Sequence, residues 1–592
     1  MWHFLILLSA LVNGSLARDF TLSELQRIYS DLPGSYIVPE SLPGLDEPVF
    51  SEVDGTLYPK DRPVSDTGFT QELFSTDIGA FNRITGSRDF LTAKTRFYSR
   101  LAFDSRKQRH ERPYPYLNGW FSLNHPPLKQ VRLPLENYIA GFDGAQRGEP
   151  QSAYFDPSFQ KDLDSTTGTA LSFENRLHLL QNGDSIAAKI RLVKESRRHV
   201  LAAVMAFSCD PSSMPLFEAL AAKAREGVPV YLMIERFYGA SLFKGCARRL
   251  REAGVRLLEV NDKWKRSSSL SFFHAKFWVR DGREAIVGGQ NIAVYENLST
   301  GYNALNRDTD IGVEGPAATD LASEFIRLWT DRRNPDETLA SIREELANAK
   351  SWQERDRVRG PAIYDEKLAD PATRMRGVCR VLVQDARNRN LSIARVLREH
   401  VLKAKRSIFI ATPEVKFHLD LREDSLLDSL YGALEERARA GVPVEFLSNG
   451  LDGGNGELTA ALRMGLEHSL QSGRPLRASF YRWILGFEPA NNARDHRKYL
   501  TRLSRNPNFR TWTHFNYIHA KIAYLDRTVT LVSSLNLDHA SVDRNTEAGI
   551  LCMDESLSAG MEPQLALDFG NSVPVISSNE IIRTENPNSS EE

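Results

Sequence analysis

The sequence predicts an α/β protein made of two pseudo-symmetric halves, each a mixed, largely parallel sheet flanked by helices, with one active site at their interface. Three observations support this prediction: the length of the chain, the alternation of strand-like and helix-like segments, and a residue pattern that occurs twice. The 592 residues, 41% of them hydrophobic, can build two or three domains. Alternating strands and helices favour sheets with helices packed outside them.

Both halves open with the same succession of elements. In each, an amphipathic helix ends in basic residues, a buried strand follows, and Gly-Val-Pro-Val comes after a further helix. The expected elements are helices at 186–198 and 393–406, strands at 200–207 and 407–411, and the Gly-Val-Pro-Val markers at 227–230 and 441–444. The repetition indicates a duplicated unit rather than two unrelated domains.

Four residue types recur with equal spacing about 245 positions apart. In both copies lysine follows histidine by two positions, aspartate by seven and asparagine by seventeen, and two small residues precede the asparagine. The members are His274, Lys276, Asp281, Gly289 and Asn291 in one copy and His519, Lys521, Asp526, Ser534 and Asn536 in the other. Equal spacing in two places is not accidental, and it indicates an enzyme.

The residue types suit chemistry on a phosphodiester. Each histidine and lysine lie two apart in an apolar run that predicts a buried strand, so both point to the same face. Two lysine cations and two asparagine amides can bind anionic oxygens, and two imidazoles can supply a nucleophile and a proton donor. The small residues before each asparagine let the backbone approach a ligand closely.

A second repeat supplies carboxylates. Aligning 307–313 with 544–550 puts Asp310 and Glu547 in equivalent places. A reacting imidazole needs a fixed acceptor for its other N–H, as in a Ser-His-Asp triad, and we expect these two carboxylates to fill that role. Asp281 and Asp526 stand at strand ends before turns, where a structural, turn-capping role is favoured.

The duplicated pattern resembles the signature of the phospholipase D superfamily, His-x-Lys-x4-Asp-x6-Gly-(Gly/Ser)-x-Asn. Ser533 stands where the superfamily has glycine, which is also a small residue. The stretches 281–291, 310–316 and 534–547 resemble in particular the bacterial cardiolipin synthase branch, C type. The resemblance extends over about residues 170–560.

This resemblance implies a fold of two phospholipase D-type halves and a two-step reaction without metal or cofactor. His274 is expected to attack phosphorus and form a phosphohistidine, and His519 to act as general acid and base, although the near symmetry leaves the opposite assignment open. The groups implied to bind the phosphoryl oxygens are Lys276, Lys521, Asn291 and Asn536.

The first residues predict export. An apolar run at 4–12 precedes the small-x-small site Ser15-Leu16-Ala17, which is typical of a signal peptide and too short to span a bilayer. We therefore expect the periplasm or cell envelope, with peripheral membrane contact. The formal net charge of −1 gives no general attraction for nucleic acid, so a phospholipid at a membrane surface is the expected partner.

Basic residues gather before each tetrad, at 263–266 and 494–510. They form either solvated loops or a surface for an anionic substrate or membrane. A monomer is expected because both halves contribute to one site. The predicted parts are 1–17, a signal peptide; 18–165, an extension of unknown role; 166–345, the first half; 346–375, a linker; 376–560, the second half; and 561–592, a tail.

The four cysteines are Cys209, Cys246, Cys379 and Cys552. Export permits disulfides, and four cysteines permit three pairings. Each cysteine lies in or beside an apolar segment, which slightly favours buried free thiols.

Three functions remain open on the sequence. Phosphatidyl transfer to an alcohol leads, followed by hydrolysis of a phospholipid or nucleic acid by the same route. A non-catalytic binding module is disfavoured because both tetrads are intact. The choice between water and alcohol as acceptor depends on how the pocket excludes water.

Overall fold

The computed structural model describes residues 18–21, 48–53, 56–59 and 152–574, with gaps at 208, 210–212, 237–245, 261–271, 293–305, 333–335, 349–357, 386–389, 414, 416–424, 449–502, 504–505, 515–516 and 571. The expected signal peptide, 1–17, and the first basic cluster, 263–266, lie outside the described residues. Of the second basic cluster, 494–510, the structure describes only 503 and 506–510. The chain divides into two compact units. One comprises 140–449 and 495–568 and contains both tetrads.

The other unit comprises 1–139, 450–494 and 569–592. Its described elements are β1 (Arg18–Thr21), β2 (Pro48–Val53), β3 (Thr56–Pro59) and β21 (Ser572–Pro574). The first three form an antiparallel sheet in which β2 is central.

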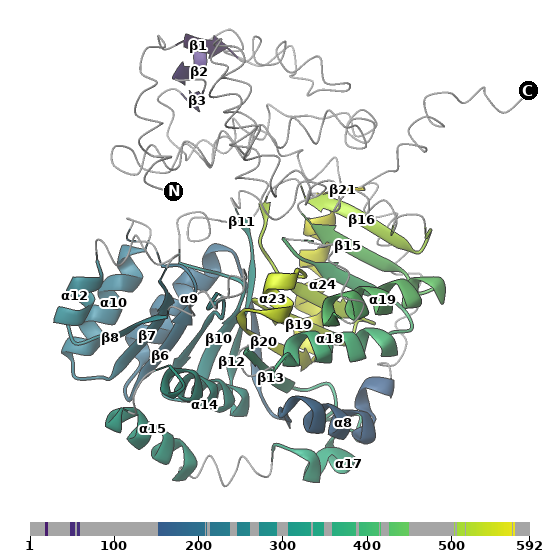
Figure 1. Ribbon diagram of the computed structural model, residues 1–592, viewed down its shortest axis with the longest axis horizontal. Helices are drawn as coiled ribbons and strands as arrows, with labels where there is room; N and C mark the ends of the chain where they lie inside the picture. Colours follow the sequence, from purple (N-terminus) through teal and green to yellow (C-terminus); the bar gives the residue numbers. More distant parts are fainter. Residues whose placement is uncertain are drawn as a thin grey trace, which may run out of the picture. The chain divides into compact units, whose positions relative to one another are not determined.

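The first half of the larger unit is one sheet covered by helices (Figure 1). Its strands follow the order β5-β12-β10-β9-β6-β7-β8. Their bounds are β5 (Arg176–Gln181), β6 (Val200–Val204), β7 (Val230–Glu235), β8 (Arg256–Val260), β9 (Phe277–Arg280), β10 (Glu284–Gly288) and β12 (Thr309–Glu314). The helices are α9 (Gly183–Glu195), α10 (Met214–Arg225), α12 (Ala247–Glu252), α14 (Pro316–Thr330) and α15 (Glu337–Asn348).

The second half repeats this arrangement. Within the larger unit its strands follow the order β16-β15-β14-β18-β19-β20-β13-β4. Their bounds are β4 (Leu171–Ser172), β13 (Val378–Asp385), β14 (Ile408–Ala411), β15 (Val444–Ser448), β16 (Phe509–His514), β18 (Ile522–Leu525), β19 (Val529–Ser533) and β20 (Thr546–Met553). The helices are α18 (Ser392–Lys403), α19 (Leu426–Arg439), α23 (His539–Asp543) and α24 (Glu555–Gly570).

The prediction of an α/β fold with two related halves is confirmed, but the sheets are not largely parallel. Parallel pairing joins β6, β7 and β8 in one half and β14, β15 and β16 in the other. The tetrad strands and their neighbours pair antiparallel. Only three residues connect β9 to β10, and so short a connection forces the chain to reverse.

The core of the first half lies between its sheet and the helices α9 and α10. Leu192, Leu216 and Leu220 on these helices are fully buried, as are β6 and β7 along their whole length. Strands covered on both faces are continuously apolar, which is why the sequence pattern located β6.

The two halves meet along the strands that carry the tetrads. β10 contacts β19 and β20, and β12 contacts β19; these strands lie side by side at the centre of Figure 1. Two short segments cross between the halves. β11 (Asn306–Arg307) pairs in parallel with β17 (Tyr517–Ile518), and Phe273 forms a bridge with Thr546.

The segment 152–172, which precedes β5, packs with the second half. η1 (Ser152–Phe155) and α8 (Pro157–Thr167) precede β4, which pairs with β13. Arg380 of β13 is fully buried and forms an ion pair with Asp164 of α8 at 2.6 Å. The boundaries predicted at 165, 345 and 560 therefore fall inside α8, α15 and α24. The predicted linker contains η3 (Pro361–Ile363) and α17 (Tyr364–Lys367).

All four cysteines form disulfides, so the expectation of free thiols is wrong. The pairs are Cys209–Cys246 and Cys379–Cys552. Cys379 and Cys552 are register partners on the antiparallel strands β13 and β20, with Cα atoms 4.2 Å apart. Apolar neighbours show that a cysteine is buried, but not that a strand 173 residues away brings a second cysteine beside it.

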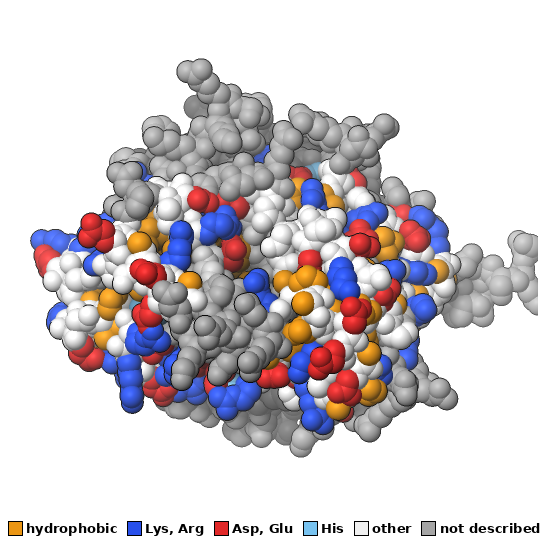
Figure 2. Space-filling view, turned by 90° about the horizontal axis from the view of Figure 1, so that it is seen from below, with side chains coloured by type: hydrophobic (Ala, Val, Ile, Leu, Met, Phe, Trp, Pro, Cys, Tyr) orange, Lys and Arg blue, Asp and Glu red, His pale blue; other side chains and the backbone are white. Residues whose placement is uncertain are grey.

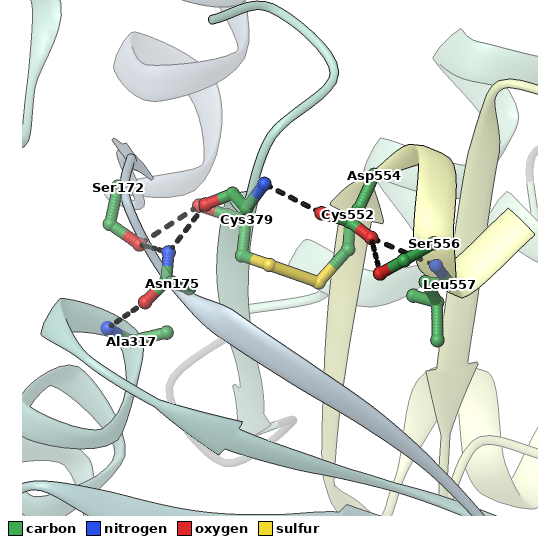
Figure 3. Close-up of a disulfide and its surroundings, with 9 residues drawn as sticks. Ser172, Asn175, Ala317, Cys379, Cys552, Asp554, Ser556 and Leu557 are labelled. Carbon is green, nitrogen blue, oxygen red and sulfur yellow. Dashed lines mark hydrogen bonds between the residues drawn. A yellow bond between two sulfur atoms is a disulfide. The ribbon is translucent and has the colours of Figure 1, made fainter.

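Figure 3 shows how the Cys379–Cys552 disulfide lies beside a junction of the halves. Asn175 Nδ2 donates to Ser172 Oγ at 3.1 Å and to Gly377 O at 2.8 Å. Its Oδ1 accepts from the backbone N–H of Ala317 at 2.9 Å. One side chain therefore joins α14 of the first half to the chain entering β13 of the second.

Across the described residues, no helix combines the length and the apolar character needed to cross a membrane.

Candidate active site

His274 lies just before β9 and is oriented by a carboxylate of the other half. Its Nδ1 is 2.7 Å from Glu547 Oε2, and Glu547 is fully buried at the start of β20. Ser534 Oγ and Asn545 Nδ2 also donate to this carboxylate. The His274 backbone N–H donates to Thr546 O at 2.8 Å. The first histidine is thus held by a strand of the second half.

His519 is held in the reciprocal way. Its Nδ1 is 2.7 Å from Oδ2 of Asp308, a fully buried residue just before β12. The His519 backbone N–H donates to Arg307 O at 2.7 Å. The Arg307 guanidinium pairs with Asp568 of α24 at 2.6 Å and 3.0 Å. Each histidine therefore depends on a carboxylate from the opposite half.

Glu547 has the orienting role expected of it, but the same expectation for Asp310 is wrong. The Asp310 carboxylate lies 2.7 Å from Lys189 Nζ and accepts from Ser185 Oγ and from the backbone N–H of Gln290. None of these partners is a histidine, and Asp308 takes the place beside His519.

The register of the strands explains the correction. The corresponding pairs are Gly288–Asp310 in β10–β12 and Ser533–Gly549 in β19–β20. Gly288 and Ser533 both lie fourteen positions after their histidine, so Asp310 corresponds to Gly549. Two positions earlier, Asp308 corresponds to Glu547. A shift of two residues keeps a side chain on the same face of a strand but moves it about 6.6 Å along.

One sequence signal could have located Asp308. An asparagine precedes the orienting carboxylate by two positions in both copies, as Asn306-x-Asp308 and Asn545-x-Glu547. The alignment that paired Asp310 with Glu547 was anchored instead on the glycines Gly312 and Gly549, which do not correspond in the register.

The small residues before each asparagine leave room for the carboxylates. A Cβ on Gly289 would lie 2.3 Å from Asp308 Oδ1, so only glycine fits there. In the second copy Ser534 occupies this position, and its hydroxyl donates to Glu547. The close approach expected at this turn is therefore made by an orienting carboxylate.

The lysines lie beside the histidines of their own copies. Lys276 Nζ donates to His274 O at 2.7 Å, and Lys521 Nζ donates to His519 O. Both lysines are 2% exposed, and each acts electrostatically on the histidines of both copies. The two tetrads therefore form one site.

The two asparagines occupy equivalent places, since Asn291 follows the end of β10 and Asn536 follows the end of β19. Asn291 Oδ1 accepts from the backbone N–H of Ala206 at 3.2 Å, which directs the amide nitrogen away from β6. Asn536 Oδ1 is buried and has no hydrogen-bond partner in the described part of the chain. Both amides can offer N–H donors to an anion.

Burial and positive charge keep both imidazoles neutral. Burial, with Lys276 and Lys521 nearby, holds the pKa of His274 well below its usual range. Burial also lowers the pKa of His519 to about 4, although Asp308 opposes the change. Neutral imidazole is the form that can attack phosphorus.

The two orienting carboxylates differ. Burial raises the pKa of Glu547 to about 8. Burial would also raise the pKa of Asp308, but the charge of His519 and its hydrogen bond outweigh it and lower the pKa to about 2. Unequal pKa values in a pair of similar groups are typical of sites with a division of acid and base roles.

Asp281 and Asp526 have structural roles, as the turn statistics favoured. Each carboxylate accepts three backbone N–H groups at the entry to a central strand. The donors are Arg197, Arg198 and His199 for Asp281 and Lys405, Arg406 and Ser407 for Asp526. The two carboxylates secure the start of β6 and β14 rather than orienting His274 or His519.

The site therefore combines two carboxylate-bound imidazoles, two ammonium groups and two amides. This set can bind a phosphodiester anion, attack its phosphorus and transfer a proton. Among the described residues, no group of three or more histidine, cysteine, aspartate or glutamate side chains could hold a metal ion.

A protein-family profile described as "Cardiolipin synthase, PLD-like domain" matches residues 190–329 and 397–567, together more than half of the chain. The two matched segments contain both tetrads and both orienting carboxylates.

Individual relatives are more distant. Cardiolipin synthase A of Pseudomonas fluorescens (strain SBW25) is 30% identical over 159 residues, which are 26% of this chain and 33% of that protein. The chain thus spans a third of that relative's length. Cardiolipin synthase A of Pseudomonas aeruginosa (strain LESB58) is 23% identical over 422 residues, covering 70% of this chain and 71% of that one. The crystal structure of phosphatidylserine synthase from Haemophilus influenzae Rd KW20 is 12% identical, covers 71% of this chain and 93% of its own, and has a TM-score of 0.48.

Proposed function

Because the chain belongs to the cardiolipin synthase family of phospholipase D-like domains, we propose that this enzyme transfers a phosphatidyl group from one phospholipid to the alcohol of another. The crossed pairs His274–Glu547 and His519–Asp308 carry the proposal. They present two oriented imidazoles in one site lined by lysine and asparagine.

In the first step, His274 Nε2 attacks the phosphorus of phosphatidylglycerol. The bond from phosphorus to the glycerol oxygen breaks, and His519 gives its proton to that oxygen. Glycerol leaves, and the phosphatidyl group stays on His274 as a phosphohistidine. Glu547 accepts a hydrogen bond from the His274 Nδ1–H throughout and stabilises the positive charge that develops on the ring.

In the second step, His519 takes the proton of a hydroxyl on a second phosphatidylglycerol. That oxygen attacks phosphorus, the bond to His274 breaks, and cardiolipin is released. The proton lost by His519 in the first step returns in the second, so two phosphatidylglycerols yield one cardiolipin and one glycerol. Lysine and asparagine donors would stabilise the charge on the phosphoryl oxygens in both steps.

His519 must be protonated before it can act as an acid. With the site empty, burial and Lys521 lower the pKa of His519 to about 4. A bound phosphodiester anion offsets the lysine charge and favours the imidazolium, so its pKa rises toward neutrality. Substrate binding thereby supplies the acid that the first step requires.

Two further features support a phospholipid substrate met outside the cytoplasm. Two disulfides suit an oxidising compartment. On the face drawn in Figure 2, basic and acidic side chains of the described residues are interspersed, unlike the basic face of a nucleic-acid binder. We infer an exported monomer that contacts the membrane surface peripherally.

The experiment is a product assay on liposomes of phosphatidylglycerol and phosphatidylethanolamine, with single-stranded DNA in parallel. Cardiolipin with an equal amount of free glycerol is the expected result. Phosphatidic acid alone would make the enzyme a hydrolytic phospholipase D. DNA cleavage with untouched lipid would overturn the substrate proposal.

His274→Ala and His519→Ala should each abolish turnover while the far-ultraviolet circular dichroism stays unchanged. Mass spectrometry of acid-sensitive phosphatidyl adducts tests the division of roles. An adduct on His274 in the His519→Ala protein supports it, and an adduct on His519 in the His274→Ala protein reverses it.

A further inference from the structure

A buried polar network surrounds Gln290, the residue before Asn291, and takes no part in the steps described above. Lys189 Nζ contacts Asp310 Oδ2 at 2.7 Å and Gln290 Oε1 at 3.0 Å. Ser185 Oγ donates to the same Asp310 oxygen. Each of these four side chains is at most 2% exposed. The network therefore holds a fully desolvated ion pair.

Gln290 is fixed at three points. Its backbone N–H donates to Asp310 Oδ1 at 3.1 Å, its side-chain oxygen accepts from Lys189, and its Nε2 donates to Asn182 O at 2.9 Å. Asn291 follows immediately. The backbone that carries this amide donor cannot turn without breaking the network.

The same network reaches the carboxylate that orients His519. Asn182 Oδ1 accepts from the backbone N–H of Asp308 at 3.0 Å, and the backbone N–H of Asn182 donates to Asp308 O at 3.1 Å. Gly288 makes room for the ion pair, because a Cβ there would lie 2.3 Å from Asp310 Oδ1.

The second half replaces the four side chains around the ion pair with apolar residues or glycine, whereas Asn182 corresponds to another asparagine, Asn390. α9 and α18 correspond with an offset of 208, since Ser196 N–H donates to Val193 O and Ala404 N–H to Val401 O at their ends. The strand register supplies the other two positions. The counterparts of Ser185, Lys189, Gln290 and Asp310 are Ile393, Leu397, Leu535 and Gly549. The three apolar counterparts are at most 3% exposed.

We propose that the Lys189–Asp310 pair, acting through Gln290, is a positioning device for Asn291 that the first half alone possesses. An apolar core at these positions folds without it, as the second half shows. Burying an ion pair in place of hydrophobic residues often costs stability. In return, the ion pair fixes the position of Gln290 through directional hydrogen bonds to its side chain and its backbone N–H. The apolar counterparts in the second half cannot form such bonds.

The test is a pair of double-mutant cycles on the full chain, measured as single-turnover rates on the liposomes above. Lys189→Met should reduce the rate by about 10- to 100-fold through misplacement of a donor. In an Asn291→Ala background the same substitution should have an effect of about twofold or less. In the matched Asn536→Ala background it should keep its full effect, because that amide belongs to the half without the network.

Gln290→Leu is a milder second variant, since it introduces the residue that the second half carries and leaves the ion pair intact. It should show the same dependence on Asn291 at unchanged melting temperature. Equal effects of Lys189→Met or Gln290→Leu in both asparagine backgrounds would overturn the proposal. So would a rate loss fully explained by the unfolded fraction.

The turnover readout rests on the proposed function, so the cycles are repeated with inorganic phosphate binding by titration calorimetry. If the wild-type protein makes no cardiolipin, the proposed function fails, and the phosphate affinities still decide the role of the network. Weaker phosphate binding in Lys189→Met that disappears in Asn291→Ala supports it, and equal weakening in both backgrounds refutes it.

Discussion

Replacing Asp308 with asparagine removes the charge that orients His519 while leaving a side chain of nearly equal volume. Asp308 Oδ2 lies 2.7 Å from His519 Nδ1, and Asp308 is fully buried. The matched variant is Asp310→Asn, two positions further along, where the carboxylate contacts Lys189 instead. Comparing the two variants tests whether Asp308, as the strand register indicates, or Asp310, as the repeat alignment suggested, orients His519.

The size of the effect follows from the electrostatics of the pair. The charge of His519 and its hydrogen bond help to hold the pKa of Asp308 below its usual value. A hydrogen bond to a charged group contributes about 1.5 to 3 kcal/mol, and its loss corresponds to roughly 10- to 150-fold in rate. An asparagine amide can in addition donate to Nδ1 and select the wrong tautomer, a change that costs up to about 10,000-fold in a serine-protease triad. We therefore expect kcat to fall by about 100- to 10,000-fold.

The assay is a pH profile of kcat for both variants on phosphatidylglycerol liposomes. Loss of the carboxylate lowers the pKa of His519, so the limb of the profile governed by this group should move to lower pH in Asp308→Asn. That limb should stay in place in Asp310→Asn, whose rate loss should be smaller. A displaced limb in Asp310→Asn with an unchanged one in Asp308→Asn would refute the assignment.

Three further outcomes are expected. Burial raises the pKa of Glu547 from 4.5 to about 8, so its stabilising contribution is complete below about pH 4.5 and lost as the pH rises through about 8. Glu547→Gln should abolish turnover, and its melting temperature should rise relative to that of the wild type as the pH increases over this range. Parallel curves of melting temperature against pH for the two proteins would contradict this expectation. Replacing both Cys379 and Cys552 with alanine should lower the unfolding free energy by about 2 to 5 kcal/mol in chemical denaturation, and an unchanged midpoint would speak against the disulfide. Asp281→Ala leaves three backbone N–H groups without their acceptor and should cost about 1 to 3 kcal/mol of stability, with kcat per folded molecule unchanged; a large loss of kcat would indicate a catalytic role instead.

Much of the catalytic apparatus could be predicted because it is written in local patterns. The two tetrads follow from spacing alone, and the buried strands β6 and β14 follow from continuous apolar runs. Glu547 could be selected because a second repeat, 307–313 aligned with 544–550, places a carboxylate just downstream of each tetrad. The structural roles of Asp281 and Asp526 followed from their place before turns.

The remaining features depend on which strands lie together. The choice between Asp308 and Asp310 depends on how β12 pairs with β10, and two registers separated by two residues place equally plausible side chains on the same face. The Cys379–Cys552 disulfide and the joining of β4 to the second sheet are long-range pairings. No local pattern records them.

The crossed histidine–carboxylate pairs also set the moment at which activity can arise during synthesis. By the time His274, Lys276 and Asn291 have left the ribosome, the acceptor for the His274 ring is still more than 250 residues away. A nascent or truncated chain that ends before Thr546 has neither the Glu547 acceptor for the His274 ring nor the Thr546 carbonyl that holds its backbone. The enzyme thus stays inert until nearly all of both repeats has been made.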